Sequence, residues 1–157
     1  MGITGPSAGG YNTLQSLVRS SGRKIFAGGV CVCGISDVKT LGQETHKQEC
    51  QYLDPLLFGW PVPGDISEEE RERVYKGRSP IWHASEIAAP LLLLHGTKDT
   101  VVPVEQARVI KEAIEGRGGE VRLVEVEGEG HMFLAPESKR VWLVEEEGWW
   151  RRTLLGL

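Results

Sequence analysis

Residues 2–10 read GITGPSAGG and contain the pattern G-x-S-x-G, with Gly5, Ser7 and Gly9 at its fixed positions. The residues before Ser7 predict the end of a strand, and residues 8–20 predict a helix, so Ser7 is expected on the tight turn between them. Such a turn forces unusual backbone angles on the serine, and the flanking glycines leave room for strand and helix to approach. The helix amides behind Ser7 favour negative charge on its reacting oxygen. The alternative is a glycine-rich turn whose serine only caps the helix.

The composition predicts a single globular domain over residues 1–157. Hydrophobic residues make up 40% of the chain and charged residues 25%, which is ordinary for a soluble protein of this length. No apolar run reaches the roughly 18 residues that a membrane span requires, so no membrane partner is expected. The 22 acidic and 18 basic residues give a formal charge of −4 without a basic stripe. A nucleic-acid partner is therefore not expected either.

The cysteines do not predict a disulfide framework. Their number, three, is odd, and Cys31 and Cys33 lie two apart in an apparent strand, so we expect reduced, buried thiols. There is no CxxC pair and no histidine cluster at ligand spacing, and no metal site is predicted. The sequence shows no signal peptide, which favours the cytoplasm. Met1 lies only four residues before the G-x-S-x-G motif, however, and need not be the true N-terminus. The oligomeric state stays open.

The remaining elements alternate in type along the chain. Apolar runs predict three further strands, at residues 25–35, 91–94 and 120–127. Helical spacing predicts two further helices, at residues 104–115 and 137–155, the second of them amphipathic. Between residues 39 and 79, prolines and glycines predict an excursion of loops and short helices, in which the capping box from Ser67 to Glu70 opens one helix. This order predicts a three-layer α/β domain with a mostly parallel sheet.

Three candidate catalytic residues fall at the carboxyl ends of these strands, in the order Ser7, Asp99 and His131. A serine hydroxyl is too weakly acidic to attack a carbonyl unaided, so a neutral imidazole must take its proton and a carboxylate must hold the imidazole tautomer. His131 is the predicted base and Asp99 the residue that orients it. The backbone N–H of Ala8, directly after the nucleophile, is the predicted oxyanion donor.

Two rivals compete for these roles. Asp37 also follows a strand and could serve as the acid, although the run from Asp99 to Pro103 favours Asp99. His95 follows the strand at residues 91–94, but it precedes the acid by only four residues. We therefore expect His95 to be a structural histidine at the exit of its strand.

Longer stretches of the sequence resemble the catalytic domain of the prolyl oligopeptidase-type (S9) serine peptidases, which is an α/β-hydrolase. The matching stretches are GPSAGGY at residues 5–11, RSPI at 78–81, PLLLLHGTKDTVVP at 90–103 and EGEGH at 127–131. The resemblance extends to Trp149 and Trp150 and is loosest between residues 39 and 76. It implies that Ser7, Asp99 and His131 match the catalytic triad of the family, and that Ala8 matches its oxyanion donor.

The resemblance also implies a substrate pocket. It places Ile35, Val38 and Val102 near the pocket for the side chain that precedes the scissile bond, with plain packing as the alternative for Ile35.

The sequence departs from the family pattern in two ways. Pro6 is not the usual residue before the nucleophile. The catalytic domain of the family begins well before the turn that carries Ser7. The chain therefore resembles its C-terminal part, without the N-terminal strands and the loop that carries the second oxyanion donor.

These observations predict a serine-type peptidase that hydrolyses short peptides through an acyl-enzyme and needs no cofactor. A carboxylic ester hydrolase of the same fold is the first alternative, because esters and amides require the same attack. A non-catalytic remnant or interaction module is the second, because an exposed first strand could pair with another chain. On its own, the chain is expected to be weakly active or inactive, since one oxyanion donor would be missing.

Overall fold

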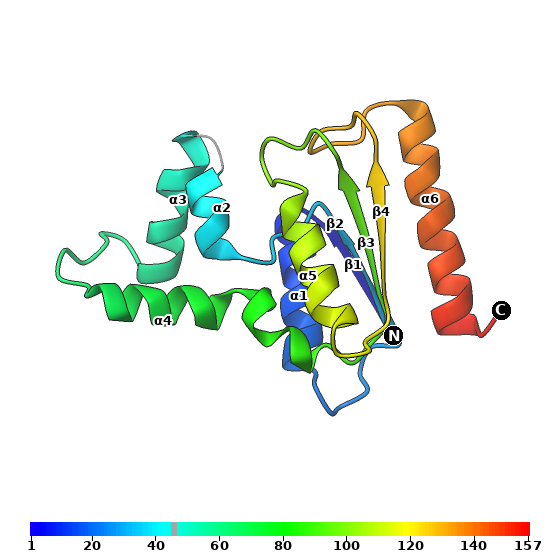
Figure 1. The fold of residues 1–157 in the computed structure, drawn as a ribbon, viewed down its shortest axis with the longest axis horizontal. Coiled ribbons are helices and arrows are strands. Elements are labelled where there is room, and N and C mark those ends of the chain that lie inside the picture. The colour runs from blue at the N-terminus through cyan, green and yellow to red at the C-terminus, as the bar shows by residue number, and fades with distance from the viewer. Residues whose placement is uncertain (45–46) are drawn as a thin grey trace.

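The computed structural model describes the backbone of residues 1–44 and 47–157, and the side chains of the same residues except those within 44–52. Its helices and strands follow one another along the chain in the order shown in Figure 1. They are β1 (Gly2–Pro6), α1 (Ala8–Arg19), β2 (Gly28–Val32), α2 (Val38–Glu44), α3 (Lys47–Phe58), α4 (Glu68–Arg78), a 3-10 helix (Pro80–Glu86), β3 (Leu91–Gly96), α5 (Glu105–Glu115), β4 (Val121–Val126) and α6 (Pro136–Trp150), which continues as a π-helical turn (Arg151–Leu155).

The four strands form one parallel sheet in the order β1-β2-β3-β4. The register pairs Pro6 with Val32, Val32 with Leu94, and Gly96 with Val126. Because all strands run in one direction, the loops that follow them leave the sheet at the same edge. The predicted parallel α/β fold is confirmed, and this edge is where the candidate site lies.

Helices cover both faces of the sheet, as Figure 1 shows. On one face α1 and α5 bury Leu14, Leu17 and Ile110 against alternate strand residues such as Leu91 and Leu93. On the other face α6 and the loop before it cover a second cluster, which contains Val30, Val32, Leu92, Leu94, Val126, Phe133 and Trp149. Successive strand residues thus face opposite cores, which explains why residues 91–94 are all apolar.

The excursion is more helical than predicted. Helices α2, α3 and α4 project away from the sheet in Figure 1. The Ser67 hydroxyl accepts a hydrogen bond from the Glu70 amide at 3.1 Å, which confirms the N-cap of α4. None of the helices in the described part of the chain is both long and apolar enough to cross a bilayer.

Two predicted elements differ from the structure. Strand β2 is shorter than predicted at both ends, and its C-terminal end is set by Cys33, whose positive φ of 46° departs from the extended backbone. Helix α6 turns Trp149 toward the sheet, whereas Val144 of α6 and Leu154 of the π-helical turn are exposed. Cys31 and Cys33 are free and buried, as predicted, whereas the side chain of Cys50 lies outside the described residues.

Gly96, the last residue of β3, allows the loop after β4 to pack against this strand. A Cβ atom at this position would lie 2.4 Å from the carbonyl oxygen of Glu129 and 2.5 Å from that of Gly130. Both contacts are with backbone atoms, which cannot rotate away as the tip of a side chain could. The loop that carries His131 therefore requires glycine at position 96.

We predict that G96A lowers the free energy of unfolding by about 1–3 kcal/mol, the usual cost of forcing an extra methyl group into a packed site. The matched control is G77A in α4, where a Cβ atom meets nothing within 4 Å. Alanine there should be neutral or stabilising by about 0.5–1 kcal/mol, because glycine is a poor helix former. Urea unfolding followed by tryptophan fluorescence measures both, and equal effects of the two substitutions would contradict the argument.

Candidate active site

Ser7 occupies a strained turn between β1 and α1. Its backbone has φ 52° and ψ −118°, and its amide donates to the carbonyl of Val32 at 2.8 Å. A Cβ atom on Gly5 would lie 2.5 Å from the backbone of Gly9, so the turn needs glycine there. The Ser7 hydroxyl does not cap α1. The capping alternative for this serine is therefore wrong, and the strand-turn-helix arrangement predicted from the sequence is present.

His131 lies in the loop after β4 and contacts both other candidate residues. Its Nε2 is 2.9 Å from the Ser7 Oγ, and its Nδ1 is 2.8 Å from the Asp99 Oδ2. A carboxylate only accepts hydrogen bonds, so the Nδ1–H donates to Asp99. In the neutral imidazole Nε2 is then the acceptor, and it faces the Ser7 hydroxyl.

Asp99 is held in the turn that follows β3. Its Oδ1 accepts hydrogen bonds from the amides of Val101 and Val102, at 2.9 and 2.8 Å, and its side chain is fully buried. Burial by itself would raise the pKa of Asp99, but the hydrogen bonds from His131, His95 and Val102 outweigh it. The pKa of this carboxyl therefore lies well below its usual range, and Asp99 stays ionised at neutral pH.

Glu129 shapes the loop that carries His131, a role that the sequence analysis did not identify. Its two carboxylate oxygens accept hydrogen bonds from the amides of Leu134 and Ala135, each at 3.0 Å. Its backbone carbonyl accepts from the Lys98 amide at 2.8 Å. The loop is thus fixed at both ends, to itself and to the turn that contains Asp99. The sequence signal that could have indicated this role is the position of Glu129 between two glycines, two residues before His131.

The rival acid Asp37 has another structural role. Its carboxylate accepts hydrogen bonds from the amides of Lys39 and Thr40 and from the Thr40 hydroxyl, so it caps the first turn of α2. In the part of the chain that the structure describes, the carboxylate hydrogen-bonded to the His131 Nδ1 is that of Asp99. The rival base His95 is buried, and its Nε2 lies 2.8 Å from the Val102 carbonyl oxygen.

An apolar cavity of about 370 Å³ opens beside Ser7 and Ala8. The three residues expected at the substrate pocket, Ile35, Val38 and Val102, all line it. Its further lining residues are Tyr11, Leu41, Leu53, Leu56, Leu57, Arg78 and Val101. The leucines come from α2 and α3, a region where the sequence shows no recognisable motif, and so the sequence analysis missed them.

One cluster in the described part of the chain has the composition of a metal site. Potential ligand atoms of Cys33, His95 and Asp99 lie within 4.8 Å of one another, and all three residues are buried. Burial raises the pKa of the Cys33 thiol to about 12, so it stays protonated. The Asp99 oxygens already accept hydrogen bonds from two amides and from His131. A cation bound there would compete with the contact between Asp99 and His131, so no metal is assigned.

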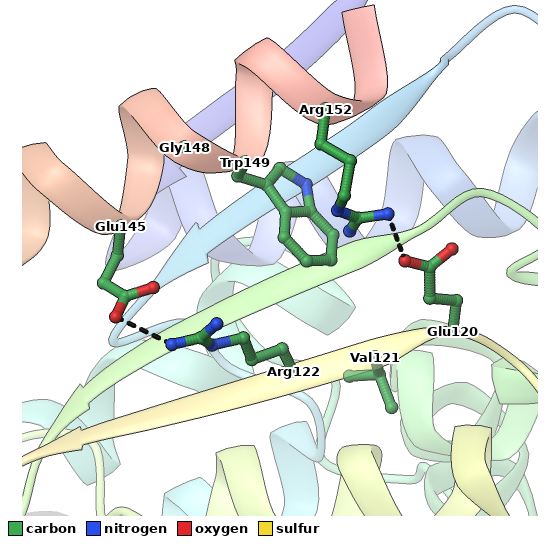
Figure 2. A pocket seen from close by; sticks show the side chains of 7 residues that line it. All are labelled: Glu120, Val121, Arg122, Glu145, Gly148, Trp149 and Arg152. Atoms are coloured by element: carbon green, nitrogen blue, oxygen red, sulfur yellow. Dashed lines mark hydrogen bonds and ion pairs between the residues drawn. The ribbon is translucent and has the colours of Figure 1, made fainter. Parts of the chain in front are cut away.

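A second cavity, of about 390 Å³, lies where β4 begins and α6 ends, away from Ser7. Figure 2 shows that its charged side chains pair with one another, Arg122 with Glu145 at 2.8 Å and Arg152 with Glu120 at 2.5 Å. The Arg152 guanidinium also lies 4.5 Å from the ring centroid of Trp149. Because these charges are satisfied internally and tie α6 to β4, this cavity is not the candidate site.

Comparison with known proteins shows which proteins the chain resembles. The chain is 29% identical over 154 residues to dipeptidyl aminopeptidase BIII of Pseudoxanthomonas mexicana, an alignment that covers 98% of the chain and 22% of that protein. It is 36% identical over 66 residues to esterase LipC of Mycobacterium tuberculosis, covering 41% of the chain and 16% of that protein.

A solved structure of a puromycin-hydrolysing peptidase of Mycobacterium tuberculosis superposes with a TM-score of 0.84 and 33% identity, over 98% of the chain and 22% of that structure. The chain thus spans about a fifth of the length of the peptidases it matches. The sequence model of the prolyl oligopeptidase family of peptidases (S9) matches residues 1–156. Since that match covers nearly the whole chain, the chain belongs to the prolyl oligopeptidase family.

Proposed function

We propose that the protein is a serine peptidase that cleaves short peptides, with Ser7 as nucleophile, His131 as general base and Asp99 as the acid that orients it. One observation carries the proposal: the His131 imidazole contacts the Ser7 hydroxyl through Nε2 and the Asp99 carboxylate through Nδ1. This is the arrangement that nucleophilic catalysis by serine requires.

In the first step the Ser7 Oγ attacks the carbonyl carbon of the scissile peptide bond, and His131 Nε2 takes the hydroxyl proton. The carbonyl electron pair moves onto oxygen and gives a tetrahedral oxyanion. The intermediate collapses when His131 returns this proton to the leaving amine, and the C–N bond breaks. A water molecule then attacks the Ser7 ester in the same way, with His131 again as base, and releases the acid and the free serine.

The oxyanion would be stabilised by the backbone N–H of Ala8. Ala8 is the first residue of α1, and the first N–H groups of a helix have no acceptor inside the helix. Ala8 also lies beside Ser7 in the wall of the apolar cavity, where a substrate carbonyl would be placed. The partial positive charge at the start of α1 favours the developing negative charge.

The cavity beside Ser7 supports a preference for an apolar side chain before the scissile bond. The described part of its lining consists mostly of aliphatic side chains from α2, α3 and the turn after Asp99, together with the charged side chain of Arg78. A buried Leu- or Phe-sized side chain gains about 1.5–3 kcal/mol of hydrophobic free energy in such a site. We therefore expect peptides with Leu or Phe at this position to be preferred over those with Gly.

Hydrolysis of carboxylic esters is a second candidate function. It is favoured by the similarity to an esterase, which covers 41% of the chain, and by the fact that esters undergo the same attack. The two activities differ in the leaving group, because an amine must be protonated as it departs.

Substitution of the two rival acids tests the assignment of Asp99. We predict that D99N lowers kcat by about 10⁴-fold, the loss seen when an amide in this place favours the wrong imidazole tautomer. D37N is the matched control, because asparagine caps helices about as well as aspartate. Its kcat should stay within about twofold. Steady-state kinetics of the complete gene product on a leucyl anilide measures both, and a larger loss in D37N than in D99N would reverse the assignment.

Paired substrates separate a peptidase from an esterase. We predict that kcat/KM for N-acyl-leucine 4-nitroanilide exceeds that for a simple 4-nitrophenyl alkanoate once each rate is divided by that of spontaneous hydrolysis, because His131 is placed to protonate the leaving amine. If only the ester is turned over, the ester hydrolase is the correct function. If neither substrate reacts and Ser7 resists fluorophosphonates, the chain is a non-catalytic module.

A further inference from the structure

We propose that His95 is a positioning residue, which holds the Asp99 carboxylate in place against His131. This inference rests on the proposed function, because it assigns a task to a residue behind the proposed triad. His95 does not contact the reacting atoms and acts only through Asp99 and the turn that carries it.

The contacts of His95 converge on that turn. Its Nε2 lies 2.8 Å from the Val102 carbonyl oxygen and 3.4 Å from the Asp99 Oδ2. Both neighbours are acceptors, so Nε2 must carry a proton, and the tautomer of His95 is set by its surroundings. The shorter contact is the main hydrogen bond, and the longer one places the same N–H beside the carboxylate.

The turn is thereby held from both sides. Val102 donates its amide to the Asp99 Oδ1 at 2.8 Å, while its carbonyl accepts from His95. The Asp99 Oδ2 is the same oxygen that accepts from His131 Nδ1. One imidazole therefore faces this oxygen from the buried side and the other from the side of Ser7. Rotation of the carboxylate away from His131 would forfeit contacts with both imidazoles.

Packing by itself does not explain a histidine at this position. Residues 91–94 of the same strand are leucines that are almost fully buried, and His95 is only 1% exposed. Burying an imidazole costs free energy unless its polar atoms are hydrogen-bonded. If this position served packing alone, leucine would therefore stabilise the fold more than histidine does. The charged residue opposite His95 on β4 is Glu125, but its carboxylate is bound by Arg108 at 2.8 and 2.7 Å. Burial keeps the Cys33 thiol protonated and uncharged, and the carboxylate that the His95 Nε2 faces is that of Asp99.

The test compares H95L, which removes the N–H, with H95Q, whose amide can still donate from a similar position. Each is made in the complete gene product, both with Asp99 intact and with D99N, and H83L serves as the control histidine. The first readout is the second-order rate at which a fluorophosphonate labels Ser7. The second is the ¹H NMR signal of the His131 Nδ1 proton, which reports the contact with Asp99 whether or not the protein turns over peptides.

We expect H95L to slow labelling by at least about tenfold, by analogy with the lower end of the loss seen when a hydrogen bond that orients a metal-ligating side chain is removed. H95Q and H83L should stay within about threefold of wild type. Because His95 acts through Asp99, H95L combined with D99N should be less than about twofold slower than D99N alone. If H95L does not fold, H95N is used in its place. The asparagine side chain is shorter, so its amide does not reach the Val102 carbonyl oxygen.

Labelling of H95L at the wild-type rate, or an equal slowing in both backgrounds, would overturn the proposal. If the wild type is not labelled at all, the proposed function fails, and the NMR signal then decides. A His131 Nδ1 proton signal that shifts or vanishes in H95L and is kept in H95Q supports positioning by His95. An identical His131 Nδ1 proton signal in wild type, H95L and H95Q overturns the proposal.

Discussion

The candidate site depends on one imidazole held between two partners that lie far apart in the sequence. His131 reaches Ser7, 124 residues away, and Asp99, 32 residues away. These distances in sequence are bridged because β1, β3 and β4 run parallel and end at one edge of the sheet. The positions of the three side chains therefore depend on the register of the strands and on the turns that follow them.

Glycine makes the close approach of these turns possible. Gly5 lets the start of α1 pass beside β1, and Gly96 lets the loop before His131 pack on the end of β3. The positive φ of Ser7 is a strained conformation, held by the backbone hydrogen bond to Val32 and by the packing of α1. Leu14 and Leu17 anchor that helix in the core, so burial of apolar side chains stabilises the turn that exposes the serine.

Local patterns predicted the sheet and the three central residues, because both have strong signals. Runs such as residues 91–94 indicate buried strands, and the G-x-S-x-G pattern requires a strand-turn-helix. The resemblance to the family placed Ile35, Val38 and Val102 in the wall of the pocket, but the rest of the wall had no such signal. Leu53 and Leu57 line the cavity beside Ser7 only through the tertiary placement of α3. Likewise Glu129, which orders the loop of His131, makes its contacts through backbone amides that any sequence provides. The burial of Trp149 but not Val144 depends on the rotation of α6 on the sheet.

Identification of the residue that a fluorophosphonate modifies tests the central claim most directly. The complete gene product is treated with the probe at neutral pH, digested, and its peptides are analysed by mass spectrometry. The account predicts a single phosphonylated residue, Ser7, and no modification in S7A or in protein that was denatured before the reaction. The control variant S21A, which replaces an exposed serine, should be labelled like wild type. Modification of another serine, or equal labelling of the S7A protein, would contradict the claim that His131 and Asp99 activate Ser7.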